Sequence, residues 1–263
     1  MMESKQQREY LKKYKRYKRI ILLIQIMIIV IFIFTWEYLS NNNIINSFIF
    51  SSPSKVINTI IDLYLANNLF RHIWVTIYET LIAFCIGLGI SLIISIMLYL
   101  YNTIYKILDP FLTCLNSLPK VALGPMIIII AGANVKSVII MAILINLIVT
   151  TMVITNGFYN TDKVKLKLMN SFGANKYQIL KYLVIPSSYK TIISSFKLGI
   201  SMSLIGVISG EFLVSREGLG YLIIYGTQVF NLNLVISGII LLIIISYILY
   251  KIVEYIEKIL LSL

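Results

Sequence analysis

The sequence predicts an all-α fold, a polytopic membrane helix bundle with six transmembrane helices and one long cytoplasmic loop. Composition is the first reason. Of the 263 residues 59% are hydrophobic and only 13% are charged, whereas soluble domains carry about 25% charged residues. The second reason is that uncharged apolar runs recur along the whole chain. A run of roughly 18 residues or more is typical of a membrane-spanning helix.

Six apolar segments are predicted to cross the membrane, and they cover residues 20–36, 74–99, 111–131, 138–158, 187–212 and 234–255. The third segment is interrupted by Pro119, Gly124 and Pro125. Membrane bundles tolerate such residues where neighbouring helices satisfy the backbone groups that the break sets free. We therefore expect an interrupted span there.

A basic head, residues 1–19, precedes the first span and holds eight of the 23 lysines and arginines. Signal peptides also begin with a basic head before an apolar run. This run is long for a signal core, however, and no small-residue cleavage motif follows it. We interpret residues 20–36 as a retained first transmembrane helix with a cytoplasmic anchor.

The positions of lysine and arginine predict the orientation. With the N-terminus inside, the inner segments hold eighteen basic residues and the outer segments four, Lys120 being left out because it lies near the start of the third span. A bias of this size sets membrane topology. Both termini, including the tail 257–263, are therefore predicted in the cytoplasm. The net charge of +12 does not indicate nucleic acid as a partner, because the basic residues flank apolar spans.

The segment 37–73 is predicted to lie outside and to carry a short surface helix. Serines and a proline at 51–54 mark its start, and apolar residues then follow with the spacing of one helix face: Val56, Ile57, Ile60, Ile61 and Tyr64. Further along, Cys85 and Cys114 have neither metal-site nor disulfide-framework spacing. We expect these two cysteines to be small buried hydrophobic residues.

The inner loop, residues 159–186, carries the strongest functional signal. Thr161 or Asp162 is suited to cap a helix that has Val164, Leu168 and Phe172 on one face. Gly173 is suited to the left-handed turn that ends such a helix.

A second helix is predicted after that turn, capped by Asn175 and stopped by Pro186. The two helices would form an elbow that presents apolar side chains to a partner protein. From periodicity alone, a helix resting on the inner leaflet with its lysines on anionic lipid explains the loop equally well.

This loop resembles the EAA loop of permease subunits in binding-protein-dependent ABC importers. Gly173 and Ala174 match its Gly-Ala pair, and residues 183–186 match its apolar end before a proline. Lys167, Leu168 and Met169 stand where that family has Glu-Ala-Ala. The acidic residue of the motif is therefore replaced by a lysine.

Other stretches resemble the nitrate, sulfonate and taurine class of the same family, in matching order and spacing. They are Ser52-Pro53-Ser54, Leu108-Asp109-Pro110, residues 118–125, Gly132, Gly210-Glu211 and residues 217–222. The resemblance extends from about residue 52 to residue 255. It makes residues 74–256 the permease core, with five transmembrane helices and the EAA-like loop 159–186.

The resemblance implies the transmembrane permease subunit of an ATP-driven importer in a bacterial cell membrane. Its implied partners are an ABC ATPase subunit, an extracytoplasmic substrate-binding protein, membrane lipids and a second permease copy in a homodimer. ATP and magnesium would be bound by the ATPase, and no cofactor is expected in this chain. The implied solute is a nitrate-, sulfonate- or taurine-like anion or a pyrimidine-type vitamin precursor. The residues implied to couple to the ATPase are Lys167, Leu168, Met169, Phe172, Gly173, Ala174 and Pro186.

Three ionisable residues, Glu79, Lys120 and Glu211, lie within or at the ends of predicted spans. Such residues are costly in a membrane and are candidates for the translocation path, although side chains near span ends also reach water by snorkelling. His72 stands alone, with no Asp, Glu or Cys cluster to indicate a metal or catalytic site.

Two other functional classes fit the sequence less well than the importer. A secondary transporter or channel would need coupling or selectivity groups near the midplane, commonly with inverted repeats, and neither is visible. A membrane-embedded enzyme would need clustered catalytic side chains, whereas the polar residues here are scattered. The sequence contains no phosphate-binding loop and no His-Glu-x-x-His or Gly-x-Ser-x-Gly motif, so an enzyme is not expected.

Overall fold

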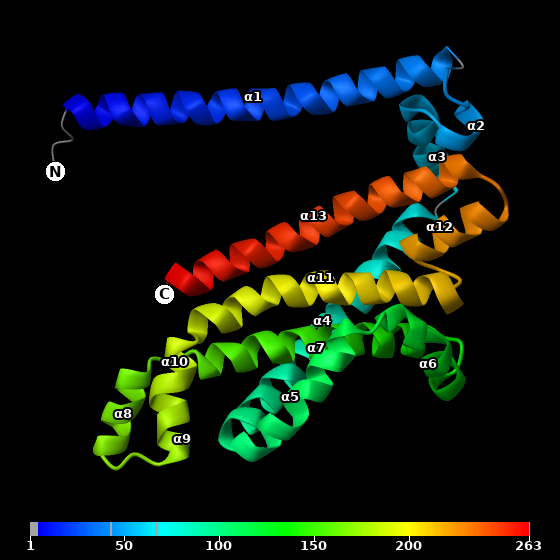
Figure 1. The fold of residues 1–263 in the computed structure, drawn as a ribbon. Coiled ribbons are helices and arrows are strands. Elements are labelled where there is room, and N and C mark those ends of the chain that lie inside the picture. Colours follow the sequence, from blue (N-terminus) through cyan, green and yellow to red (C-terminus); the bar gives the residue numbers. More distant parts are fainter. Residues whose placement is uncertain (1–4, 43, 67, 263) are drawn as a thin grey trace.

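The computed structural model describes residues 5–42, 44–66 and 68–262, and every regular element in these ranges is a helix. Within them, five helices are long and apolar enough to cross a membrane, or six if one bent pair counts as a single span. The predicted class, an all-α membrane helix bundle, is confirmed. Figure 1 shows long helices that run roughly side by side, with shorter helices at both ends.

The first helix, α1, runs from Lys5 to Asn41 without a break, so the basic head and the first predicted span form one element. It stands apart from the bundle in Figure 1, and its side chains from residue 16 to residue 35 are exposed. Its C-terminal end is attached to the rest of the molecule. There Trp36 Nε1 donates a hydrogen bond to the carbonyl of Phe50 (3.2 Å), and Ser40 Oγ donates to that of Ser51 (2.8 Å).

The predicted surface helix is present as α3, Pro53–Leu65, after the short helix α2, Ser47–Phe50. Ser52 caps α3 by accepting from the Lys55 amide, and the proline opens the helix at a position where its missing N–H costs nothing. Val56 is buried against α13, Leu232–Ser262, whereas Ile57 on the neighbouring face is exposed.

The centre of the molecule is formed by α4 (Leu69–Leu100), α7 (Val135–Tyr159), α11 (Tyr189–Val214) and α13. Small and hydroxyl residues let these helices approach closely, which is how membrane helices pack. A Cβ on Gly206 would lie only 2.4 Å from Cα of Ala142. Ser91 of α4 and Thr150 of α7 share a buried hydrogen bond of 2.6 Å.

The third predicted span, residues 111–131, is interrupted as expected, and its first arm begins earlier than predicted, at Asn102. The chain builds α5, Asn102–Ser117, then a short 3-10 turn, then α6, Gly124–Ala131, and the two arms differ in direction by 94°. The physical reason is Pro119, which cannot donate to the helix and holds Leu118 in an extended conformation (ψ 141°).

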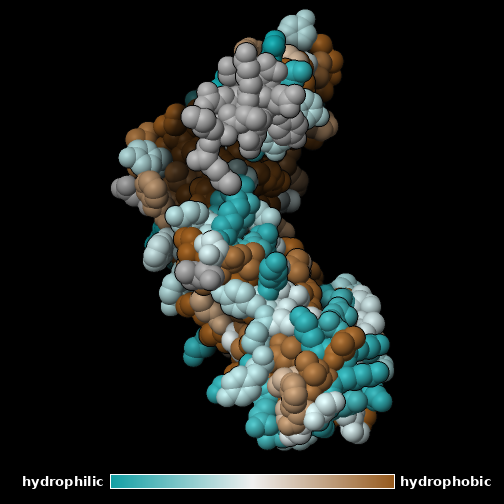
Figure 2. Space-filling model, turned by 90° about the vertical axis from the view of Figure 1, so that its left-hand side faces the viewer, coloured by the Kyte–Doolittle hydropathy of each residue, from teal (hydrophilic) through white to brown (hydrophobic). Residues whose placement is uncertain are grey.

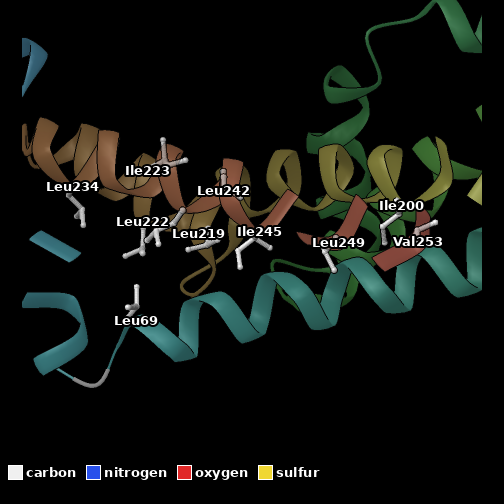
Figure 3. Close-up of a cluster of buried hydrophobic side chains, with 11 residues drawn as sticks. Leu69, Ile200, Leu219, Leu222, Ile223, Leu234, Leu242, Ile245, Leu249 and Val253 are labelled. Carbon is white, nitrogen blue, oxygen red and sulfur yellow. The ribbon is translucent and has the colours of Figure 1, made fainter. Parts of the chain in front are cut away.

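A buried apolar cluster joins α4, α11, α12 (Leu219–Gln228) and α13. Figure 3 shows Leu69 at the start of α4 opposite Leu219 and Leu222 of α12, with Leu234 and Ile245 of α13 beside them. The expectation of buried cysteines is wrong, since Cys85 and Cys114 are both exposed. Their helices, α4 and α5, turn these positions away from the packed core.

The helices divide into two groups at opposite ends of the molecule. The N-terminal end of α1, the C-terminal end of α13 and the helices α8 to α10 lie at one end of the molecule. α2, α3, α6 and α12 lie toward the other end. Residues 257–262 continue α13 as helix instead of forming a separate tail, and Glu257 is buried there against Lys197 of α11 (2.7 Å).

Candidate functional site

Two groups of residues stand out: an elbow at the end where α1 begins and α13 ends, and a buried polar cluster at the opposite end. The elbow begins with α8, Lys163–Ser171. Its predicted cap is confirmed, because Asp162 Oδ1 accepts from the Val164 amide at 2.8 Å. The predicted left-handed turn is confirmed at Gly173, whose φ is +75°.

The second arm of the elbow starts as predicted at Asn175. Asn175 and Gln178 exchange hydrogen bonds between side chains and amides at 2.8 and 2.9 Å, a capping box. The α-helix α9 is shorter than predicted, Lys176–Ile179.

Pro186 does not stop the second arm of the elbow. A π-helical turn, Leu180–Val184, leads into α10, Ile185–Ser187, and the proline sits in the first turn of α10. The Ile185 amide bonds to the Leu180 carbonyl five residues back, and a proline is tolerated in the first turn of a helix because its missing N–H would have no partner there.

One side of the elbow packs against the bundle, and the other side is exposed. We call the packed side the root and its buried residues the root cluster. Ile179, Leu180 and Val184 are buried in a cluster with Ile154 and Phe158 of α7. On the outside, Phe172 is 76% exposed and Val164 is 73% exposed. In the view onto this end of the molecule, hydrophilic residues gather over its lower part with hydrophobic residues between them (Figure 2).

The residues at the Glu-Ala-Ala positions divide between these two sides. Lys167 and Leu168 are exposed, whereas Met169 packs partly on the root cluster. Ala174 is also half-buried against that cluster. The lysine and leucine of this trio are therefore available to a partner, and the methionine connects them to the bundle.

The polar cluster forms where α11 turns into α12. We use this name for His72, Thr76 and Glu79 of α4, Glu211 of α11, and the backbone of residues 218–220. Thr76 Oγ1 donates to Glu211 Oε1 (2.7 Å) and accepts from the Leu219 amide (2.8 Å). The Gly220 amide donates to Glu211 Oε2 (2.5 Å).

His72 completes the cap of α12, because its Nδ1 accepts from the Gly218 amide at 3.0 Å. Side chains from α4 and α11 thus satisfy the first free amides of α12, which a helix start otherwise leaves without partners. The carboxylate of Glu211 also suits the partial positive charge at a helix N-terminus. Close by on the surface, Arg71 pairs with Glu217.

The structure brings together two of the three charged candidates and leaves the third apart. Glu79 and Glu211 are both fully buried, and Thr76, one helical turn before Glu79, donates to Glu211. Lys120 lies at the break between α5 and α6, where its Nζ donates to the backbone carbonyl of Asn116 (2.8 Å).

Sequence reasoning singled out Glu79 and Glu211 but missed Thr76 and treated His72 as isolated. The available signal was spacing, since residues 72, 76 and 79 fall on one face of a helix. The partner of that face is a loop about 140 residues later in the chain, and helical spacing carries no information about it.

The structure is thus that of a membrane-spanning helix bundle with a projecting basic elbow at one end. The family model described as the binding-protein-dependent transport system inner membrane component matches residues 86–261. The chain belongs to this family, and it is the permease subunit of an ABC importer. ATP is hydrolysed by a partner ATPase in such importers, so this chain is not itself an enzyme.

Individual relatives agree with this assignment. A probable ABC transporter permease protein of Haemophilus influenzae is 26% identical over 90% of this chain and 96% of its own length. A putative aliphatic sulfonates transport permease protein, SsuC of Bacillus subtilis, is 23% identical over 85% of this chain and 81% of its own. An inward-facing structure of the MetNI methionine ABC transporter shares the fold, with a TM-score of 0.63 at 16% identity over 74% of this chain and 95% of that one.

Proposed function

We propose that the elbow is the surface that binds the partner ATPase and transmits its conformational change to the transmembrane helices. The observation that supports this proposal is that the elbow has an exposed apolar tip, formed by Phe172 and Val164, and a buried root that contacts α7. An apolar tip among lysines suits a groove on a protein partner. Because the root is packed, movement of the tip transmits to the bundle as a rigid-body displacement.

The residues in this proposed contact are Lys167, Leu168, Met169, Phe172, Gly173, Ala174 and Pro186. Among them Phe172 is the best single test, since its side chain is exposed and its replacement removes no packing within the chain. Phe172→Asp is expected to reduce co-purification of the ATPase and ATP-driven uptake at least tenfold while leaving membrane insertion unchanged. The physical reason is that a charge cannot enter an apolar groove without a partner.

The matched control is Phe230→Asp, because Phe230 is equally exposed (74%) but lies in the turn between α12 and α13, at the other end of the molecule. It should leave ATPase association unchanged. Wild-type association in Phe172→Asp would overturn the docking proposal. Uptake that survives ATP depletion but collapses with the proton gradient would instead indicate a secondary transporter.

The orientation belongs to the same proposal: the end with the elbow and both termini faces the cytoplasm. The excess of lysine and arginine on that side supports it. Under this arrangement the basic head, residues 1–19, and the end of α13 lie inside, and α3 lies on the outer surface beside the substrate-binding protein.

We further infer a homodimer around a shared path, because one bundle of five or six spans is half of a usual importer permease core. The test is the mass of the purified permease after the mass of bound lipid or detergent has been subtracted. It should be twice the mass of one chain, and a single permease chain in the active complex would contradict the inference.

The proposed solute is a small sulfonate-, taurine- or nitrate-like anion or a pyrimidine-type vitamin precursor. Relatives named as permeases for aliphatic sulfonates, formylaminopyrimidine and taurine support this. Lys120, half-buried at the break of the bent pair, would face the anion, while Glu79 and Glu211 would influence the path at its outer end. Uptake of each solute class with the cognate binding protein tests the assignment, and transport of none of them would refute it.

A further inference from the structure

The polar cluster contains two carboxyl groups at one point in the protein interior. Glu79 and Glu211 have no solvent-exposed surface, and they lie at the same place in the bundle, because Thr76, one helical turn before Glu79 on α4, donates to Glu211 Oε1 (2.7 Å). Neither oxygen of Glu79 has a hydrogen-bond donor as a partner. A buried carboxylate with no donor is costly, and this cost requires a physical explanation.

No cation in the described part of the chain compensates this pair. Arg71 is the single arginine or lysine of α4, Leu69–Leu100, and it is bound to Glu217 on the surface. Arg216 of the loop and Lys136 at the start of α7 are exposed and pair with neither glutamate. Tyr221 of α12 stacks on His72.

His72 is uncharged in this arrangement. Its Nδ1 accepts a hydrogen bond from the Gly218 amide and therefore carries no proton, so the ring is the neutral form with its proton on Nε2. The charge balance of the cluster thus depends on the two glutamates alone. Two carboxylates in contact inside a protein do not both ionise, and one proton is retained between them.

The hydrogen bonds decide where this proton lies. Glu211 accepts from Thr76 Oγ1 and from the Gly220 amide, and both bonds stabilise its ionised form. Glu79 has no donor to stabilise a negative charge. A proton on Glu79 removes that charge and supplies the donor that two carboxylates lack between them.

We propose that Glu79 and Glu211 form a proton-binding site, with Glu79 as the carboxylic acid that donates its hydrogen bond to the Glu211 carboxylate. The bound proton links α4 to the start of α12 through the same carboxylate that caps α12. When the proton leaves to water, Glu79 becomes a second carboxylate and repels Glu211. The junction between α4 and the loop 215–220 then loosens, so that this end of the bundle responds to protonation.

Infrared difference spectroscopy of the full-length protein with its co-purifying subunits tests this directly. At neutral pH the wild type should show the carbonyl band of a protonated carboxylic acid, shifted by deuterium exchange, and Glu79→Gln should lack it. The control is Glu254→Gln, because Glu254 is bound by Lys251 and Lys258 on α13 and should leave the band in place. A band of equal size in Glu79→Gln and the wild type would overturn the proposal.

A second measurement needs no variant. The folded pair keeps a proton that an exposed glutamate loses above about pH 4.3, so the folded state binds more protons and its stability falls as pH rises. The wild-type unfolding temperature should fall as the pH rises above about 4.3 and should level off once the infrared band has disappeared, because the folded and unfolded states then bind the same number of protons. If sodium, potassium or calcium ions raise that temperature at fixed pH, and Glu79→Gln abolishes the effect, the pair is a metal-cation site and not a proton site.

Discussion

Gly218 has a backbone conformation that residues with a side chain rarely adopt, φ +106°, and it lies against the carboxyl group of Glu211. A Cβ at this position would be 2.3 Å from Cδ of that glutamate. Only glycine permits both the turn and the approach of the carboxylate to the start of α12. The requirement for glycine here follows from a contact between α11 and a loop seven residues later.

Gly218→Ala is accordingly expected to destabilise the protein by about 2–4 kcal/mol, the sum of backbone strain and overpacking. Scanning fluorimetry of the purified protein measures this as a lower unfolding temperature. Gly89→Ala is the matched control, since a Cβ there meets nothing within 4 Å and alanine favours the helix. Equal unfolding temperatures for the two variants would show that the cluster tolerates a shifted Glu211.

Several individual residues were predictable because their roles are local. Asp162, Gly173 and Asn175 each act within three residues of their own position, and the structure confirms all three. The connection between Thr76 and Glu211 was not predictable, because it joins positions 135 residues apart. The distant partner of a side chain is determined by how the helices pack, and the sequence of either helix alone does not indicate it.

At the scale of elements, the elbow has one face for contact with a partner and one face that packs within the chain. In the sequence both faces belong to one amphipathic pattern. The same stretch of loop carries an exposed tip, including Leu168, and a buried root, including Leu180. These two leucines should therefore respond differently to truncation, which separates contact with a partner from packing within the chain.

Leu180→Ala is expected to cost about 2–5 kcal/mol of stability, because it leaves a cavity in the root cluster. Leu168→Ala should change stability by no more than about 0.5 kcal/mol, as is usual for an exposed site, and should weaken ATPase association instead. Thermal unfolding and co-purification, measured on both variants, distinguish the two effects. A large stability loss in Leu168→Ala would mean that the tip packs against the chain itself.

The bent pair α5–α6 shows how far element prediction extends. Pro119 predicted an interruption, and the structure has one there, but its size of 94° was not readable from the sequence. A proline removes a backbone donor wherever it occurs. The angle that results depends on what the following arm packs against, and here Gly124 at the start of α6 lies against Leu213 of α11.

At the scale of the whole molecule, the elbow and α3 lie at opposite ends. With Cys85 and Cys114 replaced by alanine, a membrane-impermeant maleimide applied to intact spheroplasts should label Asn58→Cys in α3. It should label Lys165→Cys in α8 only after the cells are permeabilised. Both positions are exposed, so access depends on the side of the membrane. The reverse pattern would invert the proposed topology.

The sequence by itself determined that the protein lies in a membrane, the number and approximate limits of its apolar helices, and the caps and turn of the elbow. These properties follow from composition and from spacing within one or two helical turns, which a single sequence displays directly. The tertiary structure decided the angle of the bent pair, the division of the elbow into tip and root, and the meeting of Glu79 with Glu211 at the start of α12. Each of these depends on which helix faces which, and that is set by close packing between segments far apart in the chain.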